Sequence, residues 1–329
     1  MSDTLGNGHH GPTATWQNLR LRAALLQRVR TFFEQRGFLE VETPILSDDT
    51  VVDRHLDPFF TEVPGRPGNA PRRLWLQTSP EFAMKRLLAA GGEAIYQIAR
   101  VFRREEEGSL HNPEFTMVEW YRTEEGLDAG MQRTAELCEV LLERGPAERI
   151  SYAEAFERHV GVDPHTAEVA QLNEVLQRCG VAPPETLSPD DRDARLDLLL
   201  VERVQPHLGV GRPVLLYDYP ASQAALARVR PQEPPVAERF ELYVSGIELA
   251  NGYHELLDPE ELRRRNAAAN ALRRRDGKQP LPEQSRLLAA MQAGLPPAVG
   301  VSLGFDRVVM LAAAAKGLAE VMAFPFARA

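Results

Sequence analysis

The chain has 329 residues, of which 43% are hydrophobic and 26% charged, a composition typical of a globular protein with a sizeable core. Its formal net charge of −9 argues against a broad nucleic-acid-binding surface, because such surfaces neutralise phosphates with lysine and arginine. No stretch approaches the ~20 apolar residues of a membrane span, and the N-terminus lacks a signal peptide's basic start and apolar run, so we expect a cytoplasmic protein without a membrane partner.

The first 47 residues predict a tail, a helix and a broken strand. Residues 1–15 carry only an isolated His9-His10 pair, and we expect them to be disordered. Apolar residues recur at helical spacing over 16–36, and Gly37 is a plausible stop. Residues 38–47 have strand character around Pro44, which an ordinary edge strand would also tolerate.

Residues 48–73 are polar, with Pro and Gly clustered at 64–71, and predict a surface loop. A short strand follows at 74–78, and residues 82–90 have a helical pattern. Ser79 suits the N-cap of that helix, Pro80 its first position, and Glu81 complements the helix dipole. Capping alone would therefore account for Glu81.

A hairpin is predicted from the apolar run 94–101 and the strand-like run 115–121. On the returning strand Phe115, Met117, Glu119 and Tyr121 share one face, since side chains alternate. Aromatic rings beside a carboxylate suit a ligand-lined surface better than a plain core. The connecting loop supplies donors suited to phosphate oxygens, namely Arg103, Arg104 and His111. A solvated hairpin tip is the simpler alternative.

Residues 126–208 change character to four helical patterns, at 127–143, 152–160, 169–179 and 190–207. We interpret about 126–210 as a helical insertion without a catalytic constellation. Cys138 and Cys179 fall within it without metal-ligand spacing, which favours reduced cytosolic thiols. A strand at 214–219 returns the chain to the core.

A second candidate site lies in residues 237–256. A strand through Phe240 continues to Glu248, and we expect a turn at Asn251-Gly252 to separate Glu248 from Glu255. A carboxylate in an apolar strand needs a partner, because burying an unpaired charge is costly. Arginine or a metal ion would serve.

Two arginine runs, 263–265 and 273–275, belong to one predicted helix. A solvated face with charge pairs is favoured over contact with RNA or an acidic protein. Further on, a glycine-bearing strand from Gly300 runs into a helix that starts near Asp306 and carries Arg307 in its first turn. An arginine at that position can reach an anion or stack on a ring.

Together these stretches resemble the three motifs of the class II aminoacyl-tRNA synthetases. Motif 2, Phe-Arg-x-Glu, a loop and His-x-x-x-Phe, corresponds to Phe102, Arg103, Glu105, His111 and Phe115. Motif 3, Gly-x-Gly-x-Asp/Glu-Arg, is matched at 304–307, with Ser302 in place of the first glycine. Pro44 matches the proline of motif 1, which implies a homodimer. The resemblance implies an α+β class II synthetase catalytic fold over 16–329, an antiparallel sheet flanked by helices.

The resemblance also implies roles for individual residues, with ATP and Mg²⁺ as cofactors. Arg103, Glu105 and Arg307 would be catalytic. Nucleotide binding would involve Arg103, Arg104, Glu105, His111, Asn112, Phe115, Glu248, Leu249, Gly304 and Arg307, with Arg103 on the α-phosphate and adenine between Phe115 and Arg307. Magnesium would be held by Glu248 and Glu255. The amino-acid pocket would comprise Ser79, Pro80, Glu81, Glu119, Tyr121, Glu255 and Ser302.

Within the class, Thr78-Ser-Pro-Glu81 and the Gly-x-Glu-x-x-x-Gly-x-x-Glu pattern ending at Glu255 are similar to the lysyl-tRNA synthetases. Several carboxylates suit a substrate with two amino groups. Only about 15 residues precede the catalytic region, so we expect no anticodon-binding domain. The chain is most similar to short paralogs that activate (R)-β-lysine and transfer it to a lysine of elongation factor P, which makes tRNA an improbable acceptor. A minimal lysyl-tRNA synthetase and a non-catalytic regulatory paralog that binds lysine or ATP remain alternatives.

Overall fold

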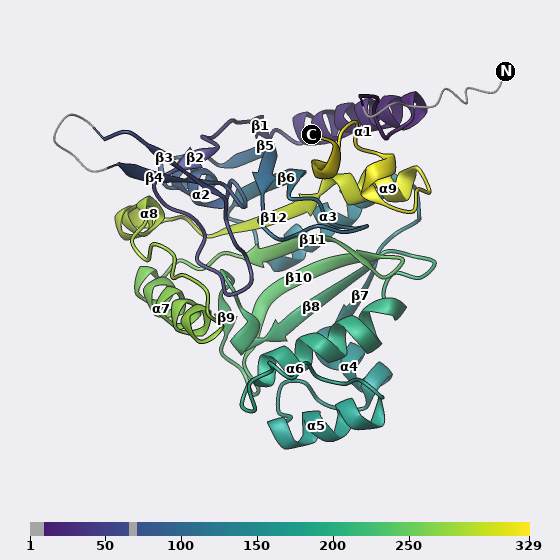
Figure 1. The fold of residues 1–329 in the computed structure, drawn as a ribbon, viewed down its shortest axis with the longest axis vertical. Helices are drawn as coiled ribbons and strands as arrows, with labels where there is room; N and C mark the ends of the chain where they lie inside the picture. Colours follow the sequence, from purple (N-terminus) through teal and green to yellow (C-terminus); the bar gives the residue numbers. More distant parts are fainter. Residues whose placement is uncertain (1–9, 66–70) are drawn as a thin grey trace. The chain divides into compact units, whose positions relative to one another are not determined.

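The computed structural model describes residues 10–65 and 71–329 and forms two compact units (Figure 1). Unit 1 consists of Met1–Tyr121, Pro259–Leu295 and Leu303–Ala329, and unit 2 of Arg122–Asp258 and Pro296–Ser302. The helical segment α1 (Trp16–Glu34) opens the described part of unit 1. Its other elements are β1 (Leu39–Glu40), β2 (Leu46–Ser47), β3 (Phe60–Val63), β4 (Arg72–Leu76), α2 (Glu81–Ala89), β5 (Ala94–Phe102), most of β6 (Glu114–Thr123), α7 (Pro259–Arg275), α8 (Arg286–Gly294), α9 (Phe305–Ala312), η4 (Leu318–Glu320) and η5 (Phe326–Arg328).

The sheet of unit 1 is packed against α1 through aromatic side chains. Strands β1, β5 and β6 are neighbours in that order, and β1 runs parallel to β5. Phe33, on the buried stripe of α1, stacks on Tyr96 with ring centroids 4.5 Å apart and contacts Phe38 and Trp120. A separate small sheet has the order β2-β4-β3, both pairs antiparallel. The predicted α1 and the β5–loop–β6 arrangement are thus confirmed.

Unit 2 contains a second run of strands, in the order β12-β11-β10-β8-β7. Buried apolar side chains from α4, α5 and α6 form its core with Tyr219 and Tyr243. The elements are α3 (Leu127–Leu142), β7 (Glu148–Ser151), α4 (Tyr152–Val160), α5 (Val169–Arg178), α6 (Arg192–Leu199), a π-helical turn η1 (Leu200–Val204), η2 (Gln205–His207), β8 (Val214–Pro220), η3 (Ala221–Gln223), β9 (Val229–Arg230), β10 (Val236–Val244), β11 (Ile247–His254) and most of β12 (Ala298–Gly304).

Two expectations about strands were incomplete. The insertion is not wholly helical, because β7 pairs parallel with β8, with Ile150 opposite Leu216. Its length of four residues is too short to leave a clear periodic signal. Strand β3 likewise lies inside the stretch expected to be a loop. Residues 66–70 of that expected loop are outside the described residues.

The expected turn at Asn251-Gly252 is wrong, because both residues lie inside β11. The chain reverses instead at Ser245 and Gly246, which have φ values of 53° and 73° and so adopt the left-handed conformation that tight hairpins require. Gly252 is glycine for another reason. It lies opposite Phe240 on β10, and a Cβ there would be 2.4 Å from Cζ of the Phe240 ring.

Part of the expected disordered tail is structured. Residues 1–9 lie outside the described residues, but Thr13 donates its backbone N–H to the Ala323 carbonyl at 2.9 Å and its hydroxyl to Met322 at 3.0 Å. Gly11 accepts a hydrogen bond from Arg328. None of the helices in the described part of the chain combines the length and apolar character that a membrane crossing requires.

Candidate functional site

The loop between β5 and β6 carries three of the predicted residues of unit 1, and one of them, Arg103, contacts residues outside the loop. The Arg103 guanidinium lies over the Phe115 ring, 5.1 Å from its centroid, and Nε donates weakly to the Thr78 carbonyl at 3.4 Å. The carboxylate beside Arg103 is Glu106, at 3.7 Å. The predicted Glu105 is mostly exposed, pairs with Arg104 at 3.4 Å and has a left-handed backbone, φ 70°. Such conformations are costly and cluster at functional sites.

Arg307, in the first turn of α9, is held against the same loop. Its Nε donates to the Leu110 carbonyl at 3.1 Å, and its Nη2 lies 2.7 Å from Nε2 of His111. Desolvation of the ring and then the Arg307 charge lower the pKa of His111, against an opposing effect of Glu106. A neutral His111 therefore accepts the hydrogen bond from Arg307, and the pair leaves a net positive charge beside Arg103.

Asp306 fixes α9 onto β6, a role that the motif alone did not reveal. Its carboxylate is buried and accepts the backbone N–H of Thr116 at 2.6 Å. It also forms an ion pair with Arg22 of α1, and Arg22 donates to the Thr116 hydroxyl at 2.7 Å. Because Asp306 and Thr116 adjoin Arg307 and Phe115 in sequence, this contact fixes the spacing of the two groups predicted to enclose adenine.

Asn112, predicted to meet phosphates, is tied into the unit 1 framework. Its amide Nδ2 donates to the Glu114 carbonyl at 2.5 Å, and its Oδ1 accepts the backbone N–H of Phe326 at 2.9 Å. Both ends of the side chain are therefore engaged, one of them by the C-terminal segment. In this structure Asn112 shapes the loop.

The predicted amino-acid pocket gathers around Glu119, which is 1% exposed. The Ser79 hydroxyl donates to one of its oxygens at 2.7 Å and the Tyr121 hydroxyl to the other at 2.5 Å. The shared face predicted for Glu119 and Tyr121 on β6 is therefore present. Burial raises the pKa of Glu119 to about 7; Glu81 adds to the rise, and the two hydroxyls and Lys85 oppose it.

Glu81 has a partner that the sequence reasoning missed, the buried Lys85, whose Nζ lies 2.5 Å from Oε1 of Glu81. The signal was visible, since a pair at i and i+4 shares one face of a helix. The N-cap of α2 is Pro80 rather than the expected Ser79. Ser79 still accepts the N–H of Glu81 at 3.0 Å, so its hydroxyl links the start of α2 to Glu119.

In unit 2, a β-bulge lies in β11 between Glu248, near the start of the strand, and Glu255, one residue beyond its end. They are seven residues apart, which in a regular strand would place them on opposite faces. The pairing with β10 shifts, however, since Tyr243 faces Glu248 while Leu242 faces Ala250. The additional residue, Leu249, shifts the alternation of side chains, and bulges commonly re-aim side chains in this way. The side chain of Leu249, predicted to take part in nucleotide binding, is buried.

The donor set suits a metal ion that arrives with phosphates. Among the described residues no group of three or more His, Cys, Asp or Glu side chains could hold a metal ion. Magnesium is commonly bound by one or two carboxylates together with substrate phosphates, and Glu248 and Glu255 provide such a pair. Ser302 is half-buried on β12, where its hydroxyl approaches the Asn251 carbonyl at 3.4 Å.

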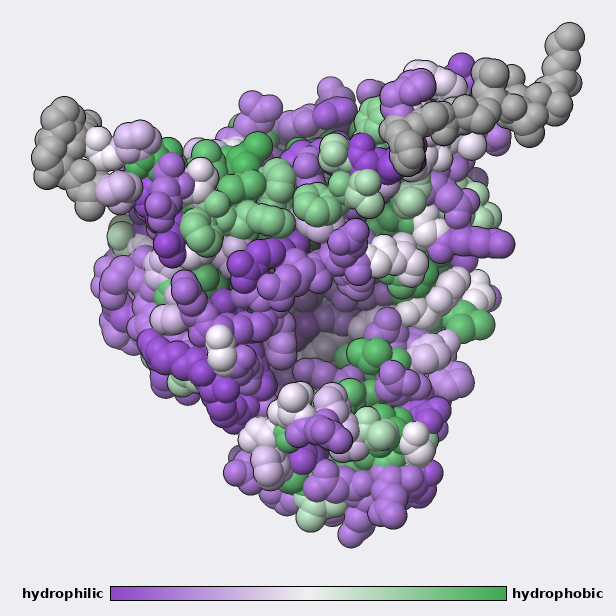
Figure 2. All heavy atoms as spheres, in the orientation of Figure 1, coloured by the Kyte–Doolittle hydropathy of each residue, from purple (hydrophilic) through white to green (hydrophobic). Residues whose placement is uncertain are grey.

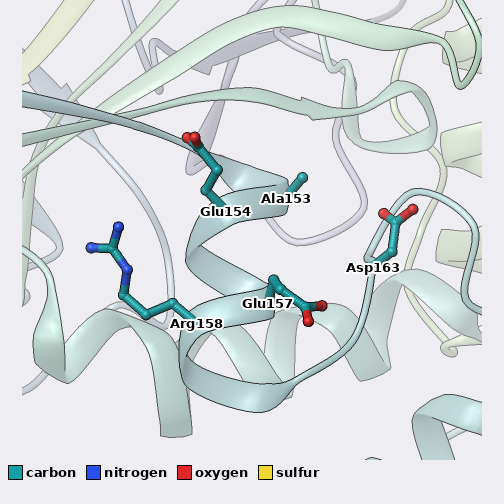
Figure 3. A pocket seen from close by; sticks show the side chains of 5 residues that line it. All are labelled: Ala153, Glu154, Glu157, Arg158 and Asp163. Carbon is teal, nitrogen blue, oxygen red and sulfur yellow. The ribbon is translucent and has the colours of Figure 1, made fainter.

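A hollow of about 460 Å³ elsewhere in unit 2 contains none of the predicted site residues. Figure 3 shows its lining on α4 and just beyond, including Glu154 and Asp163. Glu154 accepts from the backbone N–H of Ser151 at 2.9 Å and Asp163 from that of His165 at 2.9 Å. These carboxylates are occupied in local capping, so the hollow offers no built binding site.

The family model described as tRNA synthetases class II (D, K and N) matches residues 13–328. The chain therefore belongs to this family. The α+β fold class predicted from the sequence is confirmed.

Within that family the chain is similar to proteins named elongation factor P–(R)-β-lysine ligase. The one from Klebsiella pneumoniae is 48% identical over 326 residues, covering 96% of this chain and 99% of the relative. Those from Erwinia tasmaniensis and Vibrio vulnificus are also 48% identical and cover 98% and 97% of their own length. These similarities support a ligase that uses ATP.

Proposed function

We propose that this protein activates (R)-β-lysine with ATP and transfers it to a lysine side chain of elongation factor P. The observation that carries the proposal is the similarity along nearly the whole length of ligases with that name. The buried, acidic surroundings of Glu119 support it, because they suit a substrate that carries ammonium groups.

The reaction has two displacements. The carboxylate of β-lysine attacks the α-phosphorus of ATP and pyrophosphate leaves, which gives the aminoacyl adenylate. The amine of a lysine on elongation factor P then attacks the carbonyl carbon, loses a proton and expels AMP. Neither step needs a nucleophile from this chain, so catalysis rests on positioning and charge stabilisation.

Several of the predicted residues have a part in this scheme. Arg103 holds the α-phosphate, and the Arg307–His111 pair adds positive charge beside the polyphosphate. Glu119, oriented by Ser79 and Tyr121, pairs with a substrate ammonium group. Glu248 and Glu255 hold the magnesium that accompanies ATP, and that ion supplies charge neutralisation of the phosphates.

A homodimer is part of the proposal. Large apolar side chains are exposed on unit 1, among them Leu39 at 65%, Ile45 at 44% and Leu46 at 41%. Figure 2 shows apolar surface gathered where Figure 1 has β1, β2 and α2. Contiguous exposed apolar surface commonly marks a protein interface.

Two free cysteines and a net charge of −9 fit a cytoplasmic enzyme whose acceptor is a protein rather than tRNA.

The deciding experiment compares two acceptors. Elongation factor P is incubated with this protein, ATP, magnesium and (R)-β-lysine, and its intact mass is measured; a parallel reaction contains lysine tRNA and α-lysine. A gain of one lysyl unit on the factor without charged tRNA is expected. Charged tRNA with an unmodified factor would favour a minimal synthetase, and no product with no pyrophosphate would favour a non-catalytic paralog.

A further inference from the structure

A buried ion cluster in unit 1 holds the segment between β2 and β3, residues 48–59. The Asp57 carboxylate accepts from Nη2 of Arg273 at 2.7 Å and from Nζ of Lys278 at 2.6 Å. The side chains of Asp57 and Arg273 are 7% and 3% exposed, and that of Lys278 is 31% exposed. Burial alone would raise the pKa of Asp57, but Lys278 and Arg273 hold it below its ordinary value. Asp57 is therefore ionised at neutral pH.

Arg273 also binds the backbone of this segment. Its Nη1 donates to the carbonyls of Asp53 at 2.9 Å and Leu56 at 3.1 Å, and its Nε donates to that of Gln279 at 2.9 Å. One guanidinium thus fixes the course of the chain immediately before Asp57, between Asp53 and Leu56. Lysine cannot reproduce this planar arrangement of donors. The expected solvated arginine face of α7 is therefore wrong for Arg273, although Arg264 and Arg265 do pair with Glu261.

The held segment contacts the predicted nucleotide loop. The Asp57 carbonyl accepts the backbone N–H of Arg104 at 2.7 Å, in an isolated antiparallel bridge. The next residue back, Arg103, donates its own N–H to the Pro113 carbonyl at 2.9 Å. The backbone at Arg103 and Arg104 is thus fixed on one side by Pro113, the residue before β6, and on the other by Asp57.

We propose that Arg273 is a positioning residue for the nucleotide loop, acting through Asp57 on the backbone at Arg104. A buried ion pair is weak support for stability, because desolvation offsets much of the attraction. Its geometric value is larger, since the distance between Arg273 and Arg104 is bridged by a single residue with both its side chain and its carbonyl engaged. The proposal rests on the proposed function for the role of Arg103 on ATP.

The test uses Arg273→Met, Arg273→Lys and Lys278→Met, with Arg274→Met as the matched control. Arg274 adjoins Arg273 in α7, so its replacement removes the same charge from the same helix. Its side chain is exposed, whereas that of Arg273 is buried. ATP–pyrophosphate exchange gives KM for ATP and for β-lysine separately. Amide hydrogen exchange of a peptide containing Arg104 reports the bridge to Asp57, and thermal unfolding reports stability.

We expect Arg273→Met to raise KM for ATP on the order of tenfold or more, with KM for β-lysine little changed. The same variant should accelerate amide hydrogen exchange at Arg104. Arg273→Lys should restore part of the loss, and Arg274→Met none of these changes. If Arg273→Met does not fold, Lys278→Met must show a smaller rise in KM for ATP, again with KM for β-lysine little changed. Equal changes in both KM values, or unchanged amide hydrogen exchange at Arg104 in folded variants, would overturn the proposal. If the wild type showed no ATP–pyrophosphate exchange, the proposed function would be wrong. Amide hydrogen exchange at Arg104 would still show whether Arg273 acts on the Arg104 backbone.

Discussion

Two carboxylates of the same chemistry have different surroundings in the candidate amino-acid pocket. Glu81 is paired with the ammonium of Lys85, while Glu119 is bound by the neutral hydroxyls of Ser79 and Tyr121. Hydroxyls stabilise a carboxylate less than an adjacent cation does. Glu119 is therefore the carboxylate whose negative charge a cationic substrate would neutralise.

The pKa of about 7 at Glu119 predicts a pH dependence of substrate use. An ammonium group binds the ionised carboxylate, so kcat/KM for β-lysine should fall as the pH drops below 7 and level off above it. Glu119→Gln should lower kcat/KM and remove this step. Without substrate the sign is opposite for stability. Because burial raises the pKa of Glu119 from 4.5 to about 7, the wild type should lose stability relative to Glu119→Gln as the pH rises from about 4.5 to about 7, and the difference should level off above that pH. A wild-type profile that is flat between pH 6 and 8 would contradict the assignment.

Arg103→Ala should abolish ATP–pyrophosphate exchange and leave the protein folded. Its polar contacts are long, 3.4 Å to the Thr78 carbonyl and 3.7 Å to the Glu106 carboxylate, so little stability depends on them. Arg100→Ala, three residues earlier on β5 and paired with Glu114 at 3.9 Å, is the control and should retain exchange. Activity in Arg103→Ala comparable to that of the control would remove Arg103 from the site.

At the scale of elements, β11 combines two irregularities that serve different ends. The bulge at Leu249 shifts the alternation of side chains between Glu248 and Glu255, and Gly252 gives room to the Phe240 ring across the strand pair. Both depend on pairing with β10, which explains why spacing along the sequence indicated the two carboxylates but misplaced the turn. Periodicity records which residues face the core, and it does not record where a strand gains an additional residue.

Gly252→Ala should destabilise the protein by about 1–3 kcal/mol, the usual cost of overpacking a filled core. The new methyl would collide with Phe240, whose ring is fully buried. A Phe240→Leu change should partly relieve the collision, so the double variant should be more stable than the sum of the single effects implies. Chemical denaturation of the four proteins measures this coupling, and strict additivity would contradict it.

Features with local causes could be predicted from the sequence, and features that depend on distant residues could not. The helices α1 and α4 and the start of α9 were predictable, because each has an apolar stripe and recognisable ends. The groups Arg103, Phe115, Glu119 and Arg307 were found through family motifs. The Arg273–Asp57 pair was not, since its members are 216 residues apart and nothing local distinguishes Arg273 from its neighbouring arginines.

At the scale of the whole molecule, the exposed apolar surface of unit 1 predicts self-association. The chain mass is 36.7 kDa, and light scattering should give about twice that value in solution. Leu39→Glu combined with Leu46→Glu should yield monomers, because both side chains are exposed and their replacement places charge in the interface. Val210→Glu, at a 71% exposed residue of unit 2, is the matched control and should leave the mass unchanged. A monomeric wild type would rule out the proposed dimer.

Unit 1 is assembled from three separate stretches of chain, the last of which begins at Leu303. Arg307 and Asp306 belong to that last stretch, and the partners of Asp306, Arg22 and Thr116, are made nearly 200 residues or more earlier. During synthesis the ribosome therefore delivers β5, β6 and their loop long before the helix that secures them. Because domains generally fold as they emerge, we expect the Arg122–Asp258 part of unit 2 to become compact first, while the nucleotide loop stays open to chaperones and proteases until α9 leaves the exit tunnel.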